Sequence, residues 1–364
     1  MRITAAVLRA PDAPYVLEEV ELAEPGAGQV RIRVVGAGMC HTDVVPRAEG
    51  TFAPPPIITG HEGSGVVDAV GDGVASVVVG DHVVLTFDSC GDCANCRNGS
   101  PAYCDTMLFR NLTGRGLDGS TGVTDADGTE VSSRWFGQSS FATYCTANER
   151  NVVKVDADLP LEQLGPLGCG VQTGAGSVLV ALDVKPGSSL VVFGAGAVGL
   201  SAVMAAVVAD AATIIAVDLQ DHRLELASEL GATHIIDGAA TDIVEQIHAI
   251  TNGGAMYAFD TTGVPDVIVA ALASLRMAGV CGLVGAQTGD LVLDPLATLG
   301  KTIIGILEGG VDPHEFIPRM IGLWQEGRFP FDRLIETFPM SKINDAEQSS
   351  LSGGTIKPVL LPNS

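Results

Sequence analysis

Short apolar runs separated by Gly, Pro and Asp fill the first part of the chain. Runs of about four to eight residues that are rich in Val and end at turn-forming residues are typical of β-strands. Examples of such runs lie at residues 29–35, 65–70, 82–87 and 151–155. Residues 105–140 are rich in Gly, Thr, Ser and Asp and show no periodicity, so they predict a long loop. Residues 1–165 therefore predict a mostly β domain.

The pattern changes near residue 165, where strand-like and helical stretches begin to alternate. Strands are expected at residues 190–193, 213–217, 233–236, 255–260, 280–284 and 302–307. The helical stretches between them lie at residues 197–208, 222–230, 243–250 and 267–276. Such alternation predicts an α/β fold with a doubly wound parallel sheet and helices on both of its faces. Beyond residue 312 we expect one helix, at 315–326, and an extended end at 355–361.

Composition narrows the possible partners. The 364 residues include 20 Lys and Arg against 43 Asp and Glu, which gives a formal net charge of −23. The phosphates of nucleic acids and of anionic membranes repel so acidic a chain, so we expect neither as a partner. With 46% hydrophobic and 17% charged residues, the composition is that of a globular protein. Arg9, Pro11 and Asp12 interrupt the N-terminal apolar run, so we expect no signal peptide and a cytoplasmic location.

A glycine motif follows the first strand of the alternating region. Gly194, Gly196 and Gly199 form the pattern G-x-G-x-x-G directly before a helical stretch. The first glycine permits a tight turn, the second lets the backbone approach a pyrophosphate, and the third lets helix and strand pack closely. Asp218 ends the second strand, where its carboxylate would accept hydrogen bonds from an adenosine ribose and repel a 2′-phosphate. The motif predicts a dinucleotide site that prefers NAD to NADP.

Eight cysteines without an export signal indicate metal binding rather than disulfides. Four of them, Cys90, Cys93, Cys96 and Cys104, lie within fifteen residues. Four thiolates suit a closed tetrahedral zinc with a structural role. An iron–sulfur cluster also uses four thiolates and is the alternative, although the seven-residue gap before Cys104 and the lack of a Cys-Pro pair disfavour it.

Cys40, His61 and Cys169 are flanked by glycines, as expected for side chains presented from loops, but they are too far apart for spacing to group them. These segments, the four-cysteine run and the glycine motif occur in an order that resembles the zinc-dependent medium-chain alcohol dehydrogenases. The similarity covers essentially the whole chain. Residues 168–176, together with residues 138–142 and 329–332, look most similar to the aryl (benzyl) alcohol dehydrogenases.

The resemblance implies two zinc ions per chain and NAD as the cofactor. Cys40, His61 and Cys169 would hold a catalytic zinc with one position open, a ligand set known for alcohol dehydrogenase. Thr42 would hydrogen-bond the alcohol oxygen and pass its proton toward the nicotinamide ribose. Asp43 would orient the ring of His61. Cys145 and Cys281 are left over and are expected to be buried.

Further roles follow from the same resemblance. His41 and Lys357 would contact the cofactor pyrophosphate, and Arg223 would contact the adenosine ribose side. Glu62 would lie near the zinc, where assistance to ligand exchange and a buried structural role both remain open. Val45 stands where many members carry a histidine that conducts the proton to solvent, so the last proton step needs the ribose, water or another base.

The expected architecture is a GroES-like catalytic domain, residues 1–170 and 308–364, and a Rossmann coenzyme domain, residues 171–307, with the active site in the cleft between them. The expected reaction is reversible hydride transfer between NAD and a primary, aryl or bulky allylic, alcohol. Candidate pocket residues are Phe87, Phe109, Trp135, Phe136 and Phe141.

Three other functions remain open from the sequence alone. Two are related enzymes, a glutathione-dependent formaldehyde dehydrogenase and a polyol dehydrogenase. The third is a non-catalytic redox sensor that binds zinc and a nucleotide, which would leave Cys40, His61 and Cys169 unexplained as a set. We expect a homodimer or homotetramer, with the strands near residues 302–307 pairing between subunits, and no partner other than a small-molecule alcohol or aldehyde.

Overall fold

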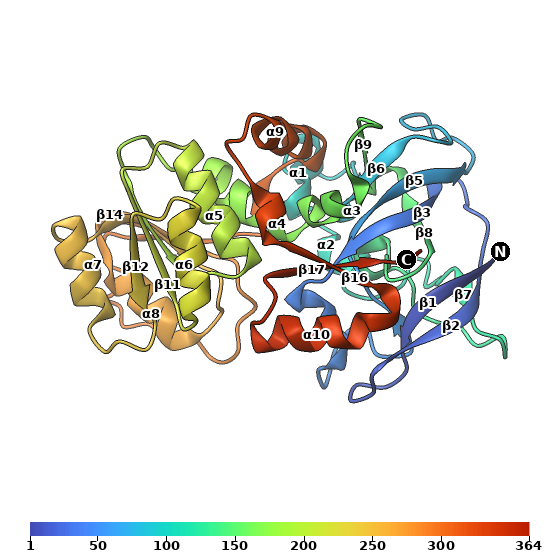
Figure 1. Cartoon of the computed structure of the whole chain (residues 1–364), viewed down its shortest axis with the longest axis horizontal. Coiled ribbons are helices and arrows are strands. Elements are labelled where there is room, and N and C mark those ends of the chain that lie inside the picture. Colours follow the sequence, from blue (N-terminus) through green and yellow to red (C-terminus); the bar gives the residue numbers. More distant parts are fainter. Residues whose placement is uncertain (364) are drawn as a thin grey trace. The chain divides into compact units, whose positions relative to one another are not determined.

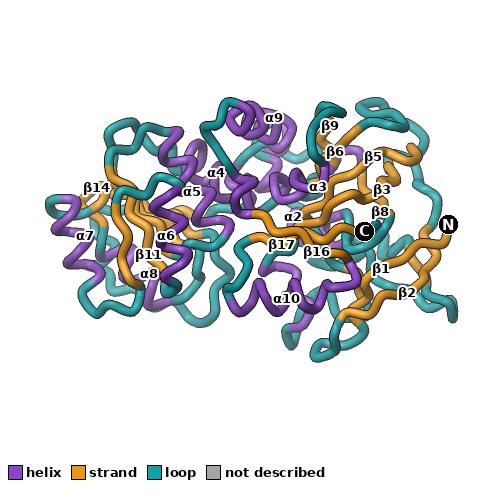
Figure 2. Tube along the Cα trace, viewed as in Figure 1, coloured by secondary structure: helices purple, strands orange, loops and turns teal. Residues whose placement is uncertain are grey.

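The computed structural model of the chain describes residues 1–363, which group into two units (Figure 1). Unit 1 comprises residues 1–169, 312–318 and 332–363, and unit 2 comprises residues 170–311 and 319–331. Unit 1 is built mainly from strands and loops, whereas unit 2 alternates strands with helices (Figure 2). Residues 319–331, which the expected boundaries assign to the catalytic domain, group with unit 2.

A six-stranded parallel sheet forms the centre of unit 2. Its order is β12-β11-β10-β13-β14-β15, with every neighbouring pair parallel. The strands are β10 (Ser189–Phe193), β11 (Thr213–Asp218), β12 (His234–Asp237), β13 (Ala255–Asp260), β14 (Leu275–Leu283) and β15 (Thr302–Gly305). The helices that connect the first five are α5 (Ala197–Val208), α6 (Asp221–Glu229), α7 (Ile243–Thr251) and α8 (Pro265–Ala273). The sheet expected from the alternating pattern is therefore confirmed.

Apolar runs explain why this sheet lies at the core of unit 2. Residues 190–193 of β10 are buried without interruption, as expected for a central parallel strand covered on both faces. The helix expected at residues 267–276 is shorter, because α8 ends at Ala273 and β14 begins two residues later. Unit 2 also holds the glycine-rich helix α4 (Gly170–Gly176), the helical turn Ser177–Ala181 and part of α9 (Pro313–Gln325).

Unit 1 contains two sheets whose strands are mostly antiparallel. The larger has the order β16-β17-β3-β5-β6-β9, with β8 also paired to β3, and the smaller has the order β4-β1-β2-β7. Its strands are β1 (Arg2–Leu8), β2 (Tyr15–Leu22), β3 (Gln29–Gly38), β4 (Ile57–Ile58), β5 (Glu62–Val70), β6 (His82–Leu85), β7 (Val123–Thr124), β8 (Tyr144–Asn148), β9 (Val152–Val155), β16 (Ile335–Pro339) and β17 (Lys357–Leu361). The runs at residues 29–35, 65–70, 82–87 and 151–155 correspond to β3, β5, β6 and β9, and the extended end expected at 355–361 contains β17.

The helices of unit 1 are short. They are α1 (Ala94–Arg97), α2 (Met107–Asn111), α3 (Leu161–Leu164) and α10 (Ile343–Ser352), and a 3₁₀ helix spans His41–Arg47. The loop expected at residues 105–140 contains α2, β7 and a 3₁₀ helix at Trp135–Gly137, but it is otherwise irregular. Most backbone N–H and C=O groups of this loop therefore have to form their hydrogen bonds within turns or with side chains.

The register of three strands brings distant parts of unit 1 together. Gly38, at the end of β3, pairs with Glu62 at the start of β5 and with Val359 near the start of β17. A Cβ on Gly38 would collide with the carboxylate of Glu62, so this close approach requires glycine. The end of β3 consequently lies between the start of β5 and β17.

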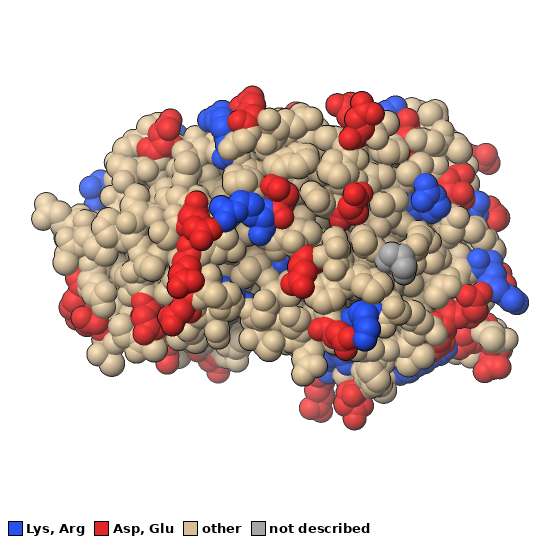
Figure 3. Space-filling view, viewed as in Figure 1, with Lys and Arg blue, Asp and Glu red and all other residues tan. Residues whose placement is uncertain are grey.

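The surface agrees with the acidic composition. On the face drawn in Figure 3, acidic and basic side chains are scattered, without a continuous basic area. Among residues 1–363, no helix has both the length and the apolar character needed to cross a membrane.

Candidate active site and metal sites

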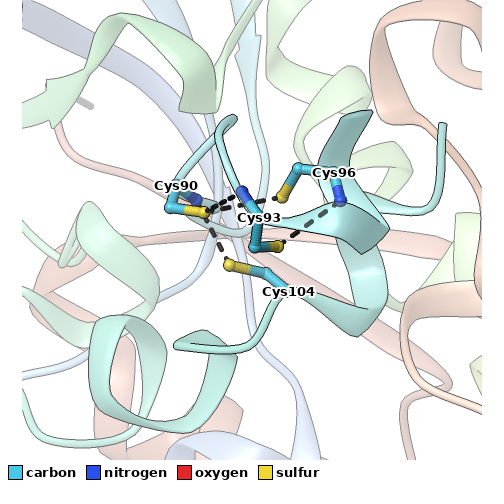
Figure 4. Close-up of side chains that lie close together, drawn as sticks. All are labelled: Cys90, Cys93, Cys96 and Cys104. Carbon is cyan, nitrogen blue, oxygen red and sulfur yellow. Dashed lines mark hydrogen bonds between the residues drawn. The ribbon is translucent and has the colours of Figure 1, made fainter. Parts of the chain in front are cut away.

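The four clustered cysteines surround a space of the size of one metal ion. The sulfur atoms of Cys90, Cys93, Cys96 and Cys104 all lie within 4.8 Å of one another and turn toward a common centre (Figure 4). The sulfurs of Cys90 and Cys96 are 3.9 Å apart, close to the ~3.8 Å that tetrahedral zinc–sulfur bonds of about 2.3 Å require. An iron–sulfur cluster contains several atoms of its own and needs more room, so the geometry favours a single ion.

Turns around the cysteines direct N–H groups at the sulfurs. The backbone N–H of Cys93 donates to Cys90 Sγ at 3.3 Å, and that of Cys90 donates to Cys104 Sγ at the same distance. Hydrogen bonds from backbone N–H groups, those of Asp105 and Cys96, lower the pKa of the Cys93 thiol to about 6. Bonds of this kind favour the thiolate, which is the form that binds metal. These residues therefore fit a structural zinc.

A second cluster forms where β3, β5 and the segment before α4 meet. Cys40 follows β3, His61 directly precedes β5, Glu62 begins it, and Cys169 ends the first segment of unit 1. One ligand atom from each of these four residues lies within 4.8 Å of the others. His61, Glu62 and Cys169 are buried and Cys40 is half-buried. The structure thus brings together the three residues that spacing could not group, with Glu62 as a fourth.

One nitrogen of His61 is available to a metal and the other is fixed. His61 Nδ1 lies 2.9 Å from Asp43 Oδ1, which also accepts from the N–H of Gly60 at 2.9 Å. The second oxygen of Asp43 accepts from the N–H of Cys40 at 3.1 Å. His61 Nε2 is buried and makes no hydrogen bond within residues 1–363. An orphaned imidazole nitrogen beside two sulfurs fits a catalytic zinc held by two cysteines and one histidine.

Positive charge beside the cluster comes from Lys357, at the start of β17. Its Nζ donates to both carboxylate oxygens of Glu62 at 2.9 Å and to the carbonyl of Met39 at 3.0 Å. The hydrogen bond from Cys169, helped by the charge of Lys357, lowers the pKa of the Cys40 thiol. Three acceptors thus face the three ammonium protons, and the pyrophosphate contact expected for Lys357 stays a prediction.

The 3₁₀ helix carries the other candidate catalytic residues. Thr42 is half-buried, and its Oγ1 accepts from the thiol of Cys40 at 3.7 Å, so its hydroxyl lies at the cluster. His41 is exposed, whereas Val45 is half-buried. The hydroxyl expected to hydrogen-bond the substrate is therefore beside the cluster, and the side chain of His41 is exposed.

The candidate pocket aromatics separate into different environments. The ring of Phe136 stacks on His61 with centroids 4.4 Å apart, and Trp135 contacts Phe136 edge-on at 5.5 Å. Phe136 has a φ of 49°, in the left-handed region that bulky side chains avoid. Phe87 and Phe141 are buried, whereas Phe109 is 63% exposed. The aromatic side chain in ring contact with a candidate zinc ligand is thus Phe136.

The glycine motif in unit 2 forms the turn between β10 and α5. Gly194 has a φ of 90°, and a Cβ on Gly199 would collide with the carbonyl oxygen of Gly194. Asp218, at the end of β11, accepts from the N–H of Ala195 at 2.6 Å, and Arg223 Nη1 lies 3.9 Å from it. The turn exposes the N-terminus of α5, to which a pyrophosphate can bind.

Sequence reasoning missed some contacts at the second cluster. Gln138 donates to the carbonyl of His61 at 2.9 Å and accepts from the N–H of Gly63 at 3.0 Å. Tyr15 bonds Thr59 at 2.8 Å, and its hydroxyl donates to the carbonyl of Asp43 at 3.4 Å. No local motif marks these residues, because their roles depend on tertiary contacts.

Comparison with known proteins identifies related chains. Residues 26–157 match the model of the alcohol dehydrogenase GroES-like domain, and residues 197–326 match that of the zinc-binding dehydrogenases. Geraniol dehydrogenase of Castellaniella defragrans is 46% identical, over 98% of this chain and 97% of the relative. Alcohol dehydrogenase 6 of Peromyscus maniculatus is 37% identical, over 100% and 98%.

The solved structures that this chain resembles are also alcohol dehydrogenases or carry their zinc-binding domain. The crystal structure of an alcohol dehydrogenase zinc-binding domain protein from Burkholderia ambifaria has a TM-score of 0.96 and 48% identity, with all of both chains covered. Benzyl alcohol dehydrogenase from Acinetobacter calcoaceticus has a TM-score of 0.95 and 43% identity, covering 99% of each chain. The expected fold class, a GroES-like domain with a Rossmann domain, is thereby confirmed. The chain belongs to the zinc-dependent alcohol dehydrogenase family, whose members use zinc and NAD.

Proposed function

We propose that this enzyme oxidises primary alcohols whose hydroxyl carbon is attached to an aromatic ring or a double bond, and reduces the corresponding aldehydes. The observation that carries the proposal is the cluster of Cys40, His61 and Cys169 with the ring of Phe136 stacked on His61. An apolar aromatic side chain beside the ligands favours apolar substrates over polyols. Relatives named geraniol dehydrogenase and benzyl alcohol dehydrogenase support the same substrate class.

In this proposal each metal site has its own role. Cys40, His61 and Cys169 hold the catalytic zinc, and Cys90, Cys93, Cys96 and Cys104 hold the structural zinc. When bound, zinc supplies a Lewis acid that makes an alcohol hydroxyl more acidic, and NAD accepts the hydride.

The chain's own residues bind, orient and move the proton. Thr42 accepts the hydrogen bond of the alcohol hydroxyl and donates its own proton onward, which a hydroxyl can do because it both donates and accepts. Asp43 holds the ring of His61 in one orientation through Nδ1. Glu62, fixed by Lys357, places a carboxylate at the cluster. His41, exposed on the same 3₁₀ helix, is proposed to bind the cofactor pyrophosphate.

Residues of unit 2 would bind the rest of the cofactor. Gly194, Gly196 and Gly199 let the pyrophosphate approach the N-terminus of α5. Asp218 accepts from the adenosine ribose and repels a 2′-phosphate, and Arg223 lies beside it. This arrangement favours NAD over NADP.

A substrate panel tests the proposal. Initial rates of NADH formation are measured with benzyl alcohol, geraniol, ethanol, sorbitol and hydroxymethylglutathione, alongside the zinc content per chain. We expect two zinc ions and the highest kcat/KM with benzyl alcohol or geraniol. Faster turnover of sorbitol or hydroxymethylglutathione would replace the proposal with a polyol or formaldehyde dehydrogenase, and one zinc with no turnover would indicate a sensor.

Self-association is a second part of the proposal. β15 is one of the two edge strands of its sheet, Ile303 within it is 37% exposed, and Leu307, two residues beyond it, is 43% exposed. An exposed apolar edge strand favours pairing with another chain. We therefore propose a homodimer or homotetramer in which β15 pairs between subunits, which sedimentation velocity would measure.

A further inference from the structure

A polar hollow of about 280 Å³ lies in unit 1. None of the cysteines or histidines of the two candidate metal clusters lines it. Three arginines line it, Arg110, Arg115 and Arg134, together with two carboxylates, Asp88 and Asp118. Among the side chains that line the hollow, three cations thus face two anions, in a chain whose net charge is −23.

Two of the arginines already have carboxylate partners. Arg110 Nη1 lies 3.0 Å from Asp88, which also accepts from Asn148 at 2.8 Å. Arg115 Nη1 lies 2.9 Å from Glu130. Their Nη2 groups make no hydrogen bond within residues 1–363, so each arginine keeps donors to offer. A guanidinium has five N–H donors in a fixed fork, and part of that fork is unused here.

The third arginine has no such partner. In the part of the chain that the structure describes, the Arg134 side chain makes neither an ion pair nor a hydrogen bond. The carboxylate of Asp118, on the same hollow, accepts instead from the hydroxyl and the N–H of Ser120, at 2.7 and 3.0 Å. Burial lowers the pKa of Arg134, although the charges of Asp118 and Asp88 act in the opposite direction. Its charge is thus available to a ligand.

We propose that this hollow is a binding site for a small oxyanion, such as sulfate, phosphate or a carboxylate, held by Arg134 with Arg115 as a second donor. Planar guanidinium groups bind oxyanions through paired N–H···O bonds that are stronger than neutral hydrogen bonds. A free carboxylate or phosphate would supply the direct ion pair that Asp88 and Asp118 do not make with Arg134. The site is independent of the proposed substrate, so its failure would leave the proposed function intact.

Sulfate titration tests the site directly. The zinc-loaded enzyme is saturated with NADH to occupy the cofactor site, and sulfate is added at constant ionic strength while the unfolding temperature is followed. Sulfate also stabilises proteins without a site, but that effect does not saturate and is the same in all variants. Phosphate and benzoate, in parallel titrations, distinguish a tetrahedral from a planar ligand.

Three variants identify the residue responsible. Arg134→Gln removes the unpaired charge, Arg134→Lys keeps it without the fork, and Arg2→Gln removes an equal charge from a side chain that is 72% exposed. We expect saturable binding in the wild type and in Arg2→Gln, at least about tenfold weaker binding in Arg134→Gln, and an intermediate value in Arg134→Lys. Equal binding in the wild type and Arg134→Gln would overturn the proposal, as would the absence of saturable binding for all three anions.

Discussion

Replacing Lys357 by Met is expected to destabilise unit 1 strongly, because it leaves a buried carboxylate without its partner. Glu62 is 0% exposed and Lys357 is 2% exposed, so water cannot replace the lost ammonium. The variant loses two bonds of 2.9 Å to Glu62 and one of 3.0 Å to Met39. Breaking a buried ion pair in this way costs about 3–5 kcal/mol.

The loss should be visible in thermal unfolding. For domains of this size, each kcal/mol shifts the unfolding midpoint by about 2–4 °C, so we expect a decrease of roughly 6–20 °C. The measurement is near-UV circular dichroism of the zinc-loaded protein at one scan rate and one zinc concentration. These conditions are kept fixed because bound metal itself changes the midpoint.

A double variant separates the buried charge from lost packing. Lys357→Met with Glu62→Gln removes the unpaired carboxylate while nearly keeping both volumes, so we expect it to recover most of the lost stability. Glu62→Gln alone leaves the ammonium unpaired and should also be destabilised. A Lys357→Met midpoint within 2 °C of the wild type, or a double variant no more stable than the single ones, would refute the reasoning.

Four further outcomes are expected. Asp218→Ser should lower the ratio of kcat/KM for NAD to that for NADP at least about tenfold, because the charge that repels the 2′-phosphate is lost. Cys104→Ser should reduce the zinc content by about one ion per chain and lower the unfolding temperature, measured by metal analysis and calorimetry. Phe136→Leu keeps an apolar side chain but loses the aromatic face, so kcat/KM for benzyl alcohol should fall about 2–10-fold more than for hexanol. Val45→His should add to the pH dependence of kcat/KM a group that titrates near ~6.5 and is missing in the parent, and an unchanged profile would contradict the relay position assigned to residue 45.

Local motifs could be predicted because their geometry is contained in a few consecutive residues. The cysteines from Cys90 to Cys104 converge through turns within their own segment, and Gly194, Gly196 and Gly199 form one turn between a strand and a helix. In both cases the spacing alone determines which atoms can meet. The alternation of strands and helices in unit 2 was predictable for a similar reason, since each element has its own apolar period.

The second cluster could not be assembled from spacing. Cys40 and His61 become neighbours only through the register of β3 and β5, and Lys357 reaches Glu62 through the pairing of β17 with β3. The resemblance to a family supplied the set Cys40, His61 and Cys169, but it did not indicate that Lys357 is buried against Glu62.

Helix α4 shows a segment in which the helix propensities of the residues do not predict the helix that forms. Residues 170–176 contain three glycines, which disfavour a helix by about 1 kcal/mol each. A Cβ on Gly174 would collide with the carbonyl oxygen of Val198, so close packing against α5 requires glycine there. β2 was not predicted for a different reason. Its alternation of buried and exposed residues is broken, because neighbouring residues such as Glu18 and Glu19 are exposed or half-buried.

The pairing of β17 with β3 has a consequence for biosynthesis. At bacterial or eukaryotic elongation rates, the ribosome needs about 10–40 s to proceed from Cys169 to Lys357. During that interval the nascent polypeptide already contains both sulfurs and the imidazole, while Glu62 still lacks its ammonium partner. The emerging chain therefore passes through a stage in which metal could be captured before the C-terminal strand closes the sheet.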